Sequence, residues 1–301
     1  MRRLVTLTVA AMLALTLAQE VPERRIITID SSGGTQRGNL QYGPIHYSHP
    51  DPDGIKATVS SLAIFAQEAE LAGPEGVLLS QAQGERDATF TGGVRVERGR
   101  LTAHGPDLAY SEASGIGLLN GPVEIVIAPR DEADEPVSIA ADEASFDVDT
   151  DVSTSRGAVE LISGRSTAGA EEAVYEEDRD LAKLVSEGAQ VTMVRVDDDG
   201  EELVITADDV RVLTAEDRLL AQGNVTLVRG NTTSTGDTVF FDDEASRALI
   251  LGSPAEAVNE VEGTRTSGGV LEQRTDIDAV RVYSDPIDFA ESDFLLTAEI
   301  D

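Results

Sequence analysis

The chain has 301 residues, of which 23 are Lys or Arg and 56 are Asp or Glu, so its formal net charge is −33. This charge argues against a nucleic-acid surface and against docking on anionic lipid headgroups, because both need basic residues. The absence of Cys excludes disulfides, thiolate metal sites and Cys nucleophiles, while a hydrophobic share of 41% is that of a folded protein.

The first residues have the pattern of a secretory signal peptide. Arg2 and Arg3 supply a positive start, Leu4–Leu17 is an apolar run, and small residues precede the polar Gln19. An uncleaved membrane anchor is the alternative, but a spanning helix needs about 20 apolar residues. We therefore predict a signal peptide over residues 1–18, cleavage after Ala18, and export to the periplasm or cell envelope.

Residues 19–87 are expected to form an N-terminal region with one degenerate copy of the repeat described below. Within it, His46 and His49 lie close to Asp51 and Asp53, and two imidazoles with two carboxylates could ligate zinc. We favour a polar loop, since the His-x-x-His spacing lacks a helix to present it. The sequence thus predicts no metal site and no cofactor.

The dominant feature is a repeat of about 65 residues. The pattern G-x-V-x-[VL]-x-x-G occurs three times, with starts 65 and then 66 residues apart, at Gly92–Gly99, Gly157–Gly164 and Gly223–Gly230. Stacking such units lets neighbours bury a shared apolar core. We expect three repeats over 88–283 (88–151, 152–217 and 218–283) and a C-terminal strand or tail over 284–301.

Each repeat has the periodicity of antiparallel β-strands. Its apolar residues alternate with polar ones, which turns one face inward, and the bounding glycines suit turns or bulges. The motif Ile139–Asp142 recurs as Ile205–Asp208 and, more loosely, as Ile64–Gln67. Ser61–Leu71 is the one stretch with a helical pattern, and it fits a pair of strands equally well.

We therefore predict an all-β protein with little helix, built as an elongated and twisted antiparallel stack of repeats. The stack is folded over so that two sheet faces oppose each other, and repeated apolar residues line the seam between them. These residues are Val94, Val96, Tyr110, Val159, Leu161, Tyr175, Val225, Leu227 and Phe241. Their side chains either fill the seam or leave it open as a trough, and the aromatic ones are either its gates and walls or plain core.

The residues needed for catalysis or for a calcium loop are largely missing. With three His and no Cys, few nucleophile–base pairs are available, and no phosphate-binding or hydrolase motif occurs. Asp147, Asp149 and Asp151 resemble the start of a calcium loop, but Val152 replaces its glycine and the closing Glu is absent. We predict no enzyme, and interpret these Asp residues as the outer face of a strand.

The order of short motifs over Ile205–Pro254 resembles the LptA/OstA family of periplasmic lipopolysaccharide-transport proteins, which are β-jellyrolls. The closest match is Gly223-Asn224-Val225 together with Gly236-Asp237, and the resemblance covers roughly 88–283. It implies a bridge that shields the acyl chains of a lipid between two sheet faces and passes the lipid across the envelope. It also implies partners: a lipid or lipopolysaccharide-like amphiphile, envelope transport proteins, and further copies joined through edge strands.

Two features depart from this family. The chain is long for a minimal member, and it is acidic for a protein that handles an anionic lipid, since like charges repel. The alternative is a non-catalytic structural scaffold of the envelope with calcium bridging its acidic faces. An open trough would favour transport, and a filled seam would favour the scaffold.

Overall fold

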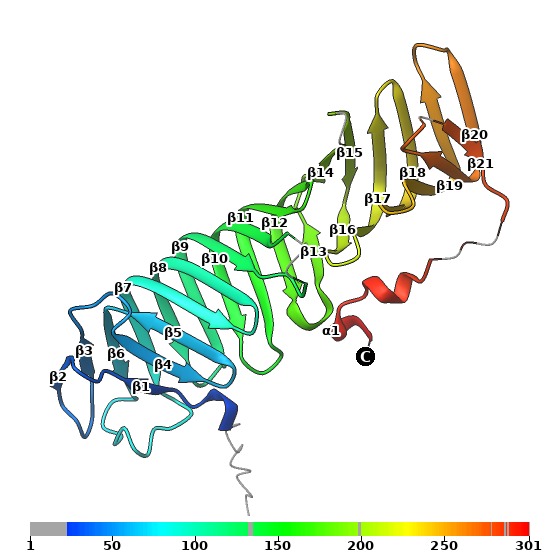
Figure 1. Cartoon of the computed structure of the whole chain (residues 1–301). Coiled ribbons are helices and arrows are strands. Elements are labelled where there is room, and N and C mark those ends of the chain that lie inside the picture. Colours follow the sequence, from blue (N-terminus) through cyan, green and yellow to red (C-terminus); the bar gives the residue numbers. More distant parts are fainter. Residues whose placement is uncertain are drawn as a thin grey trace, which may run out of the picture.

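The computed structural model describes residues 23–131, 135–197, 200–277, 279–285, 287 and 289–300. The predicted signal peptide lies outside these residues. Within them, 21 strands pair into one continuous β-structure in which all strand pairs are antiparallel, and the molecule is long and twisted (Figure 1). The predicted fold class is confirmed.

Among the described residues, helix is confined to short segments. They are η1 (Glu23–Arg25), η2 (Glu177–Arg179), η3 (Glu291–Phe294) and α1 (Thr297–Ile300). Nowhere in the described ranges is there a helix of the length and apolarity that crossing a membrane requires.

The strands fall into three groups along the chain. The N-terminal group contains β1 (Thr28–Asp30), β2 (Thr35–Gly38), β3 (Ile45–Ser48), β4 (Ile55–Val59), β5 (Leu62–Ala66) and β6 (Glu68–Ala72). The central group contains β7 (Asp87–Arg98), β8 (Leu101–Ser111), β9 (Ile116–Ile127), β10 (Val137–Asp147), β11 (Val152–Ser163) and β12 (Ser166–Glu176). The C-terminal group contains β13 (Leu181–Val185), β14 (Val191–Val196), β15 (Glu202–Ala207), β16 (Asp209–Leu213), β17 (Arg218–Arg229), β18 (Thr232–Asp242), β19 (Arg247–Asn259), β20 (Thr264–Arg274) and β21 (Ala279–Val282).

Most long strands contribute to both sheets because they bend in the middle. Between β17 and β18 the register slips after Gln222, and pairing resumes at Val225. Similar slips interrupt the pairing of β7 with β8 and of β11 with β12. Elsewhere two short strands replace one long strand: β5 and β6 pair with the two halves of β7, and β15 and β16 with those of β17. Ser61–Leu71 thus forms strands.

The bend explains why two motifs recur together. Gly157 and Gly223 have φ of +76° and +80°, and a Cβ at either position would lie 2.5 Å from a carboxylate oxygen of Asp142 or Asp208. Only glycine fits where a positive φ meets so close a neighbour. The glycine of the G-x-V motif therefore faces the aspartate of the preceding I-x-A-D motif.

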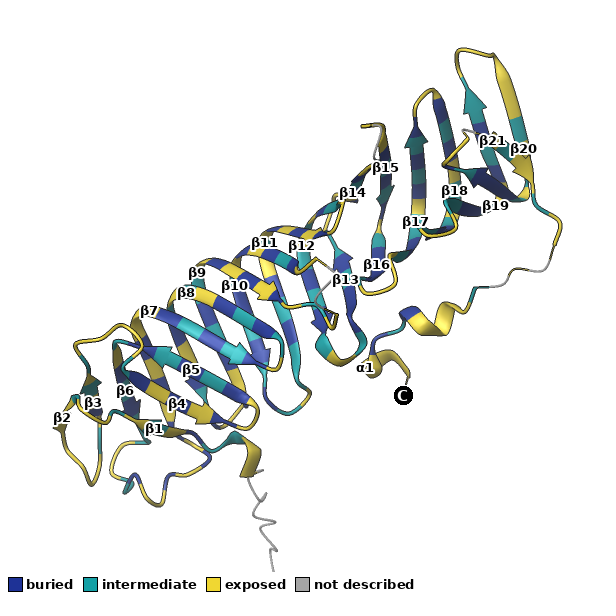
Figure 2. Ribbon diagram, in the orientation of Figure 1, coloured by how far each residue is buried: buried dark blue, intermediate teal, exposed yellow. Residues whose placement is uncertain are grey.

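The folded-over sheets enclose one long apolar core. It runs from Ile27 near η1 to Leu271 in β20, and buried residues alternate with exposed ones along most strands (Figure 2). Residues 23–48 add η1 and β1 to β3 at the N-terminal end, where β1 pairs with β4 and β3 with β6.

A second, smaller apolar cluster lies where the C-terminal segment 289–300 packs against β13 and β16 to β19. The segment runs back along the stack after β21 (Figure 1). Phe289 stacks on Phe240 with ring centroids 4.5 Å apart, and Phe294 meets the same ring edge-on at 6.0 Å. The predicted C-terminal strand or tail is therefore a tail that covers the outer face of the C-terminal strands.

Candidate functional site

The candidate site is the seam between the two sheets. All nine predicted seam residues belong to the one long core, and none is more than 2% exposed. They are Val94, Val96, Tyr110, Val159, Leu161, Tyr175, Val225, Leu227 and Phe241. Their own side chains thus fill the seam around them.

The repeated aromatic residues lie near the rim of the seam. The Tyr110 hydroxyl donates to the carbonyl of Arg25 at 2.6 Å, and the Tyr175 hydroxyl donates to Asp180 Oδ1 at 3.2 Å. Burial raises the pKa of Tyr175 to about 12, so this side chain stays neutral. Because each ring is in the core and each hydroxyl is at the turns, the two tyrosines form the outermost apolar layer of the seam.

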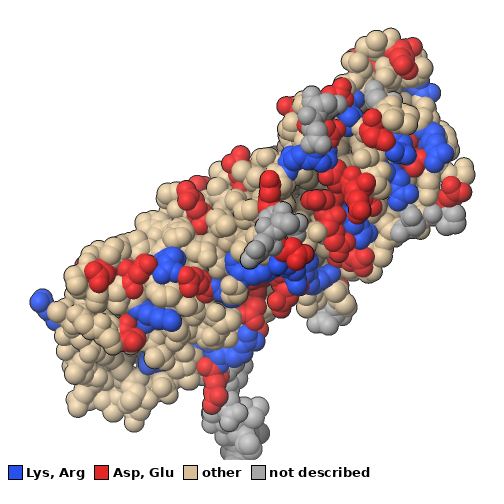
Figure 3. Space-filling model, viewed as in Figure 1, with Lys and Arg blue, Asp and Glu red and all other residues tan. Residues whose placement is uncertain are grey.

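Two rows of turns face each other across the mouth of the seam. We call the turns on one side, together with the end of the adjoining β14, the basic edge. It carries Arg98, Arg100, Arg130, Arg165 and Arg195. The turns on the other side, which we call the acidic edge, carry Asp151, Glu177, Asp180 and Asp243. Basic and acidic side chains lie next to one another along this face (Figure 3).

Ion pairs and hydrogen bonds join the two edges. Asp180 accepts from Arg100 at 2.6 Å and from Arg130 at 2.5 Å. Further along the stack, Arg165 lies 3.5 Å from Asp243, and Arg195 also pairs with Asp243. Burial alone would raise the pKa of Asp180, but the hydrogen bonds from the two arginines outweigh it and lower the pKa. These contacts hold the mouth closed over the apolar core.

Arg98 is the most deeply buried of these arginines. Its side chain is 4% exposed, its Nε lies 3.8 Å from Glu177 Oε2, and none of its three guanidinium nitrogens has a hydrogen-bond partner. Burial lowers its pKa, since a charged group is disfavoured away from water. Arg98 therefore occupies the mouth as a large, charged side chain whose guanidinium group makes no hydrogen bond.

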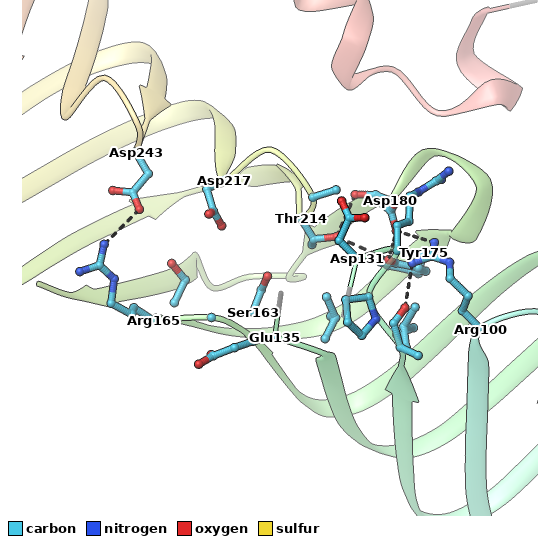
Figure 4. Close-up of a pocket in the computed structure, with 18 of the residues that line it drawn as sticks. Arg100, Asp131, Glu135, Ser163, Arg165, Tyr175, Asp180, Thr214, Asp217 and Asp243 are labelled. Atoms are coloured by element: carbon cyan, nitrogen blue, oxygen red, sulfur yellow. Dashed lines mark hydrogen bonds and ion pairs between the residues drawn. The ribbon is translucent and has the colours of Figure 1, made fainter. Parts of the chain in front are cut away.

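A cavity of about 460 Å³ opens between the Arg130–Asp180 and Arg165–Asp243 pairs. Its lining includes Ile127, Val137, Ser163, Tyr175 and Thr214. Figure 4 shows Ser163 on one side of the opening and Thr214 with Tyr175 on the other. Because Ile127, Val137 and Tyr175 belong to the long core, the cavity connects the surface to the seam.

The histidines do not lie together in one polar loop as predicted. His46 lies in β3 rather than in a loop, with its Nδ1 3.0 Å from Glu70, and His49 is 3.8 Å from Asp51. In the described part of the chain no group of three His, Asp or Glu side chains could hold a metal ion.

The alternating aspartates do not form the outer face of a strand. Only Asp147 ends β10, while Asp149 and Asp151 lie in the turn that follows it. There Asp149 accepts from Arg25 at 2.8 Å, and Asp151 accepts from Arg24 at 2.7 Å and from Ser61 at 2.6 Å. These acids therefore bind the N-terminal segment and the turn between β4 and β5.

The closed mouth is the part of the site that the sequence analysis missed. A signal for it exists, since Glu112, Glu177 and Asp243 recur with steps of 65 and 66 residues, as the aromatic positions do. Glu177 and Asp243 face arginines of the basic edge, whereas Glu112 is buried at the N-terminal end with Arg86, whose Nε donates to it at 2.9 Å.

The family model described as "LptA/(LptD N-terminal domain) LPS transport protein" matches residues 138–246. This stretch is an LptA-like domain. It includes β11, β12 and β17, and so two of the three G-x-V segments on which the predicted resemblance rests.

Among solved structures, the chain is similar to LptH, "the LptA homologous periplasmic component of the conserved lipopolysaccharide transport device from Pseudomonas aeruginosa". The identity is 13% and the TM-score 0.37, and the match covers 42% of this chain and 87% of the LptH chain. No curated protein matches the chain.

Proposed function

We propose that this protein is an exported, periplasmic bridge of the lipopolysaccharide-transport type, which shields the acyl chains of a lipid or lipopolysaccharide-like amphiphile between its two sheets. The observation that carries this proposal is the single apolar core, which runs the length of the stack and through the LptA-like domain. An acyl chain in such an interior gains about 0.8 kcal/mol for each buried CH₂ group.

A filled seam is compatible with this role if the two sheets can part. Two of the ion pairs at the mouth have an exposed arginine, since the side chains of Arg130 and Arg165 are 54% and 45% exposed. Such pairs contribute only about 0–1 kcal/mol each. An acyl chain that replaces side-chain contacts in the seam can therefore offset the loss of these two pairs.

The second candidate function is an envelope scaffold, and the filled seam favours it. In that case the buried valines, leucines and aromatic residues are permanent core, and the acidic surface associates through calcium. The two candidates differ in one measurable property, which is the access of an acyl chain to the seam.

The chain has no Trp, so a single Trp can report on this access. Phe241→Trp places the indole in the seam, whereas Phe65→Trp places it on the opposite face of β5, beside Arg95. Each variant is delipidated and titrated with stearic acid brominated near mid-chain, which quenches indole fluorescence on contact. Transport predicts strong quenching for Phe241→Trp and little for Phe65→Trp. No quenching, or equal quenching of both, would contradict the transport role and favour the scaffold.

A further inference from the structure

The mouth of the seam changes character in the middle repeat. In the first repeat, Arg98 ends β7 directly before the turn glycine, and in the third repeat Arg229 ends β17 in the same way. Counting 65 and then 66 residues along the chain gives Ser163 as the equivalent residue at the end of β11. A small hydroxyl therefore stands where the other two repeats have a long guanidinium side chain.

The cavity lies where this side chain is small. Ser163 lines it, and the Asp243 carboxylate, which is equivalent to the Glu177 that Arg98 approaches, lines it as well. In the first repeat the same space between the edges contains the 4%-exposed Arg98 side chain. The missing arginine thus leaves room for this cavity, whereas the cavity of about 850 Å³ in the first repeat is lined by Arg98 and Glu177 themselves.

The lining of the cavity fits an amphiphile. Its inner part is apolar, with Ile127, Val137 and the ring of Tyr175, and it continues into the long core. Its rim carries Arg130 and Arg165, each paired with an acid, and also the acidic residues Asp131, Glu135 and Asp217. Guanidinium groups bind carboxylate or phosphate oxygens by exchanging such partners. An apolar floor with guanidinium groups on its rim suits an acyl chain that ends in an anionic headgroup.

We propose that this cavity is a lateral opening through which the acyl chain of an anionic amphiphile enters the seam, with the headgroup held at Arg130 and Arg165. This proposal rests on the proposed transport function. It differs from loading at the ends of the stack, where the N-terminal end is covered by η1 and β1 and by the buried Arg86–Glu112 pair. Passage at Ser163 displaces a small side chain, whereas passage at Arg98 displaces a buried charge.

The test restores the arginine that the repeat lacks. In the Phe241→Trp protein, Ser163→Arg places a guanidinium within reach of Asp243, while Ser163→Ala is the matched control that keeps the opening. We expect Ser163→Arg to slow the quenching by the brominated fatty acid by about tenfold or more and Ser163→Ala to leave its rate unchanged. Equal rates in the two variants would overturn the lateral opening.

A second form of the experiment does not depend on folding of the arginine variant. The chain has no Cys, so Ser163→Cys introduces a single thiol that can be alkylated with a bulky maleimide after folding. Alkylation should slow quenching as the arginine does, and an unchanged rate after full alkylation would also overturn the proposal. If the Phe241→Trp parent shows no quenching at all, the transport function itself fails, which is a distinguishable result.

Discussion

Three equivalent residues at the strand bends have a left-handed backbone. Gly93, Ala158 and Asn224 follow the bend glycines and have φ of +84°, +44° and +48°. Glycine adopts this region freely and asparagine tolerates it, and Asn224 Nδ2 also donates to Asp208 Oδ2, 16 residues earlier in the chain, at 2.7 Å. Alanine has neither advantage, so the middle repeat contains a strained residue.

Ala158→Gly should therefore stabilise the protein, by about 0.5–1 kcal/mol, because it removes the Cβ that makes a left-handed backbone unfavourable. The free energy of unfolding from urea denaturation measures this change. Gly157→Ala is the control of opposite sign, since its Cβ would lie 2.5 Å from Asp142 Oδ2. A destabilised Ala158→Gly protein would contradict this account of the bend.

At the scale of elements, the C-terminal tail stands out because it covers a face that would otherwise be apolar and exposed. Beneath it lie large side chains from five strands, which are Leu181, Leu213, Leu220, Phe240 and Leu249. Polar contacts hold the tail as well, since Glu176 accepts from the amide of Thr297 at 2.8 Å and the carbonyl of Asp293 accepts from Arg179 at 2.8 Å.

Ending the chain after Tyr283 should expose this face. We expect stronger binding of an apolar dye and concentration-dependent self-association in analytical ultracentrifugation, because a contiguous apolar patch on a soluble protein promotes association. The circular dichroism spectrum of the β-structure should stay unchanged, since the long core shares no residue with the tail cluster. A shortened chain that stays monomeric and binds no dye would show that the tail does not protect this face.

Attachment of the tail should also depend on pH through Glu299. Burial would raise the pKa of this carboxyl, but hydrogen bonds from Lys183 and Arg211 outweigh it and lower the pKa to about 2 from the ordinary 4.5. A lowered pKa stabilises the attached tail above pH 4.5, and this contribution is lost as the pH falls towards 2.

The measurement compares the parent with Glu299→Gln. Because Glu299 is exposed, the parent should be more stable by only about 1 kcal/mol at neutral pH. The difference should shrink between pH 4.5 and pH 2. Release of the tail is measured by dye binding to the face that it uncovers, and the two proteins are compared at each pH. A difference that does not change over this range would contradict the role of the Glu299 ion pairs.

At the scale of the whole molecule, the stack ends in strands that have an unpaired side. The amide of Tyr283 donates to the carbonyl of Val270, so these two residues form a hydrogen-bonded pair and the amide of Val282, one residue earlier, points away from β20. No described strand pairs with that side of β21. At the other end, β1 and β2 are the outermost strands of the two sheets.

End-to-end association through these edges should increase with ionic strength. Each chain carries a formal net charge of −33, and salt screens the repulsion between copies. We expect the mean mass in light scattering to rise between low and moderate salt. Val282→Pro should prevent this rise, because proline lacks the outward amide while the β20–β21 hydrogen bonds made by its neighbours stay intact. A mass that is independent of salt, or unaffected by the proline, would contradict pairing at this edge.

The sequence by itself determined the period, the strand alternation and the set of inward-facing residues. Val94, Val159 and Val225 could be placed in one core because alternation along a strand and recurrence along the chain are both local patterns. Their proposed role in lipid binding stays a prediction. The interpretation of Asp147, Asp149 and Asp151 as a strand face was wrong, because the end of a strand depends on where its partner turns.

Only the tertiary structure decided that the seam is filled and that its mouth is closed. Arg100 and Asp180 are 80 residues apart, and the fold-over of the sheets brings them to 2.6 Å. The same holds for the tail, whose apolar residues are too few to form a core of their own and pack on a face made by five strands. Both kinds of contact join residues that are far apart in the sequence. Their alignment depends on the bend and twist of the strands, which are properties of the whole stack and not of any local pattern.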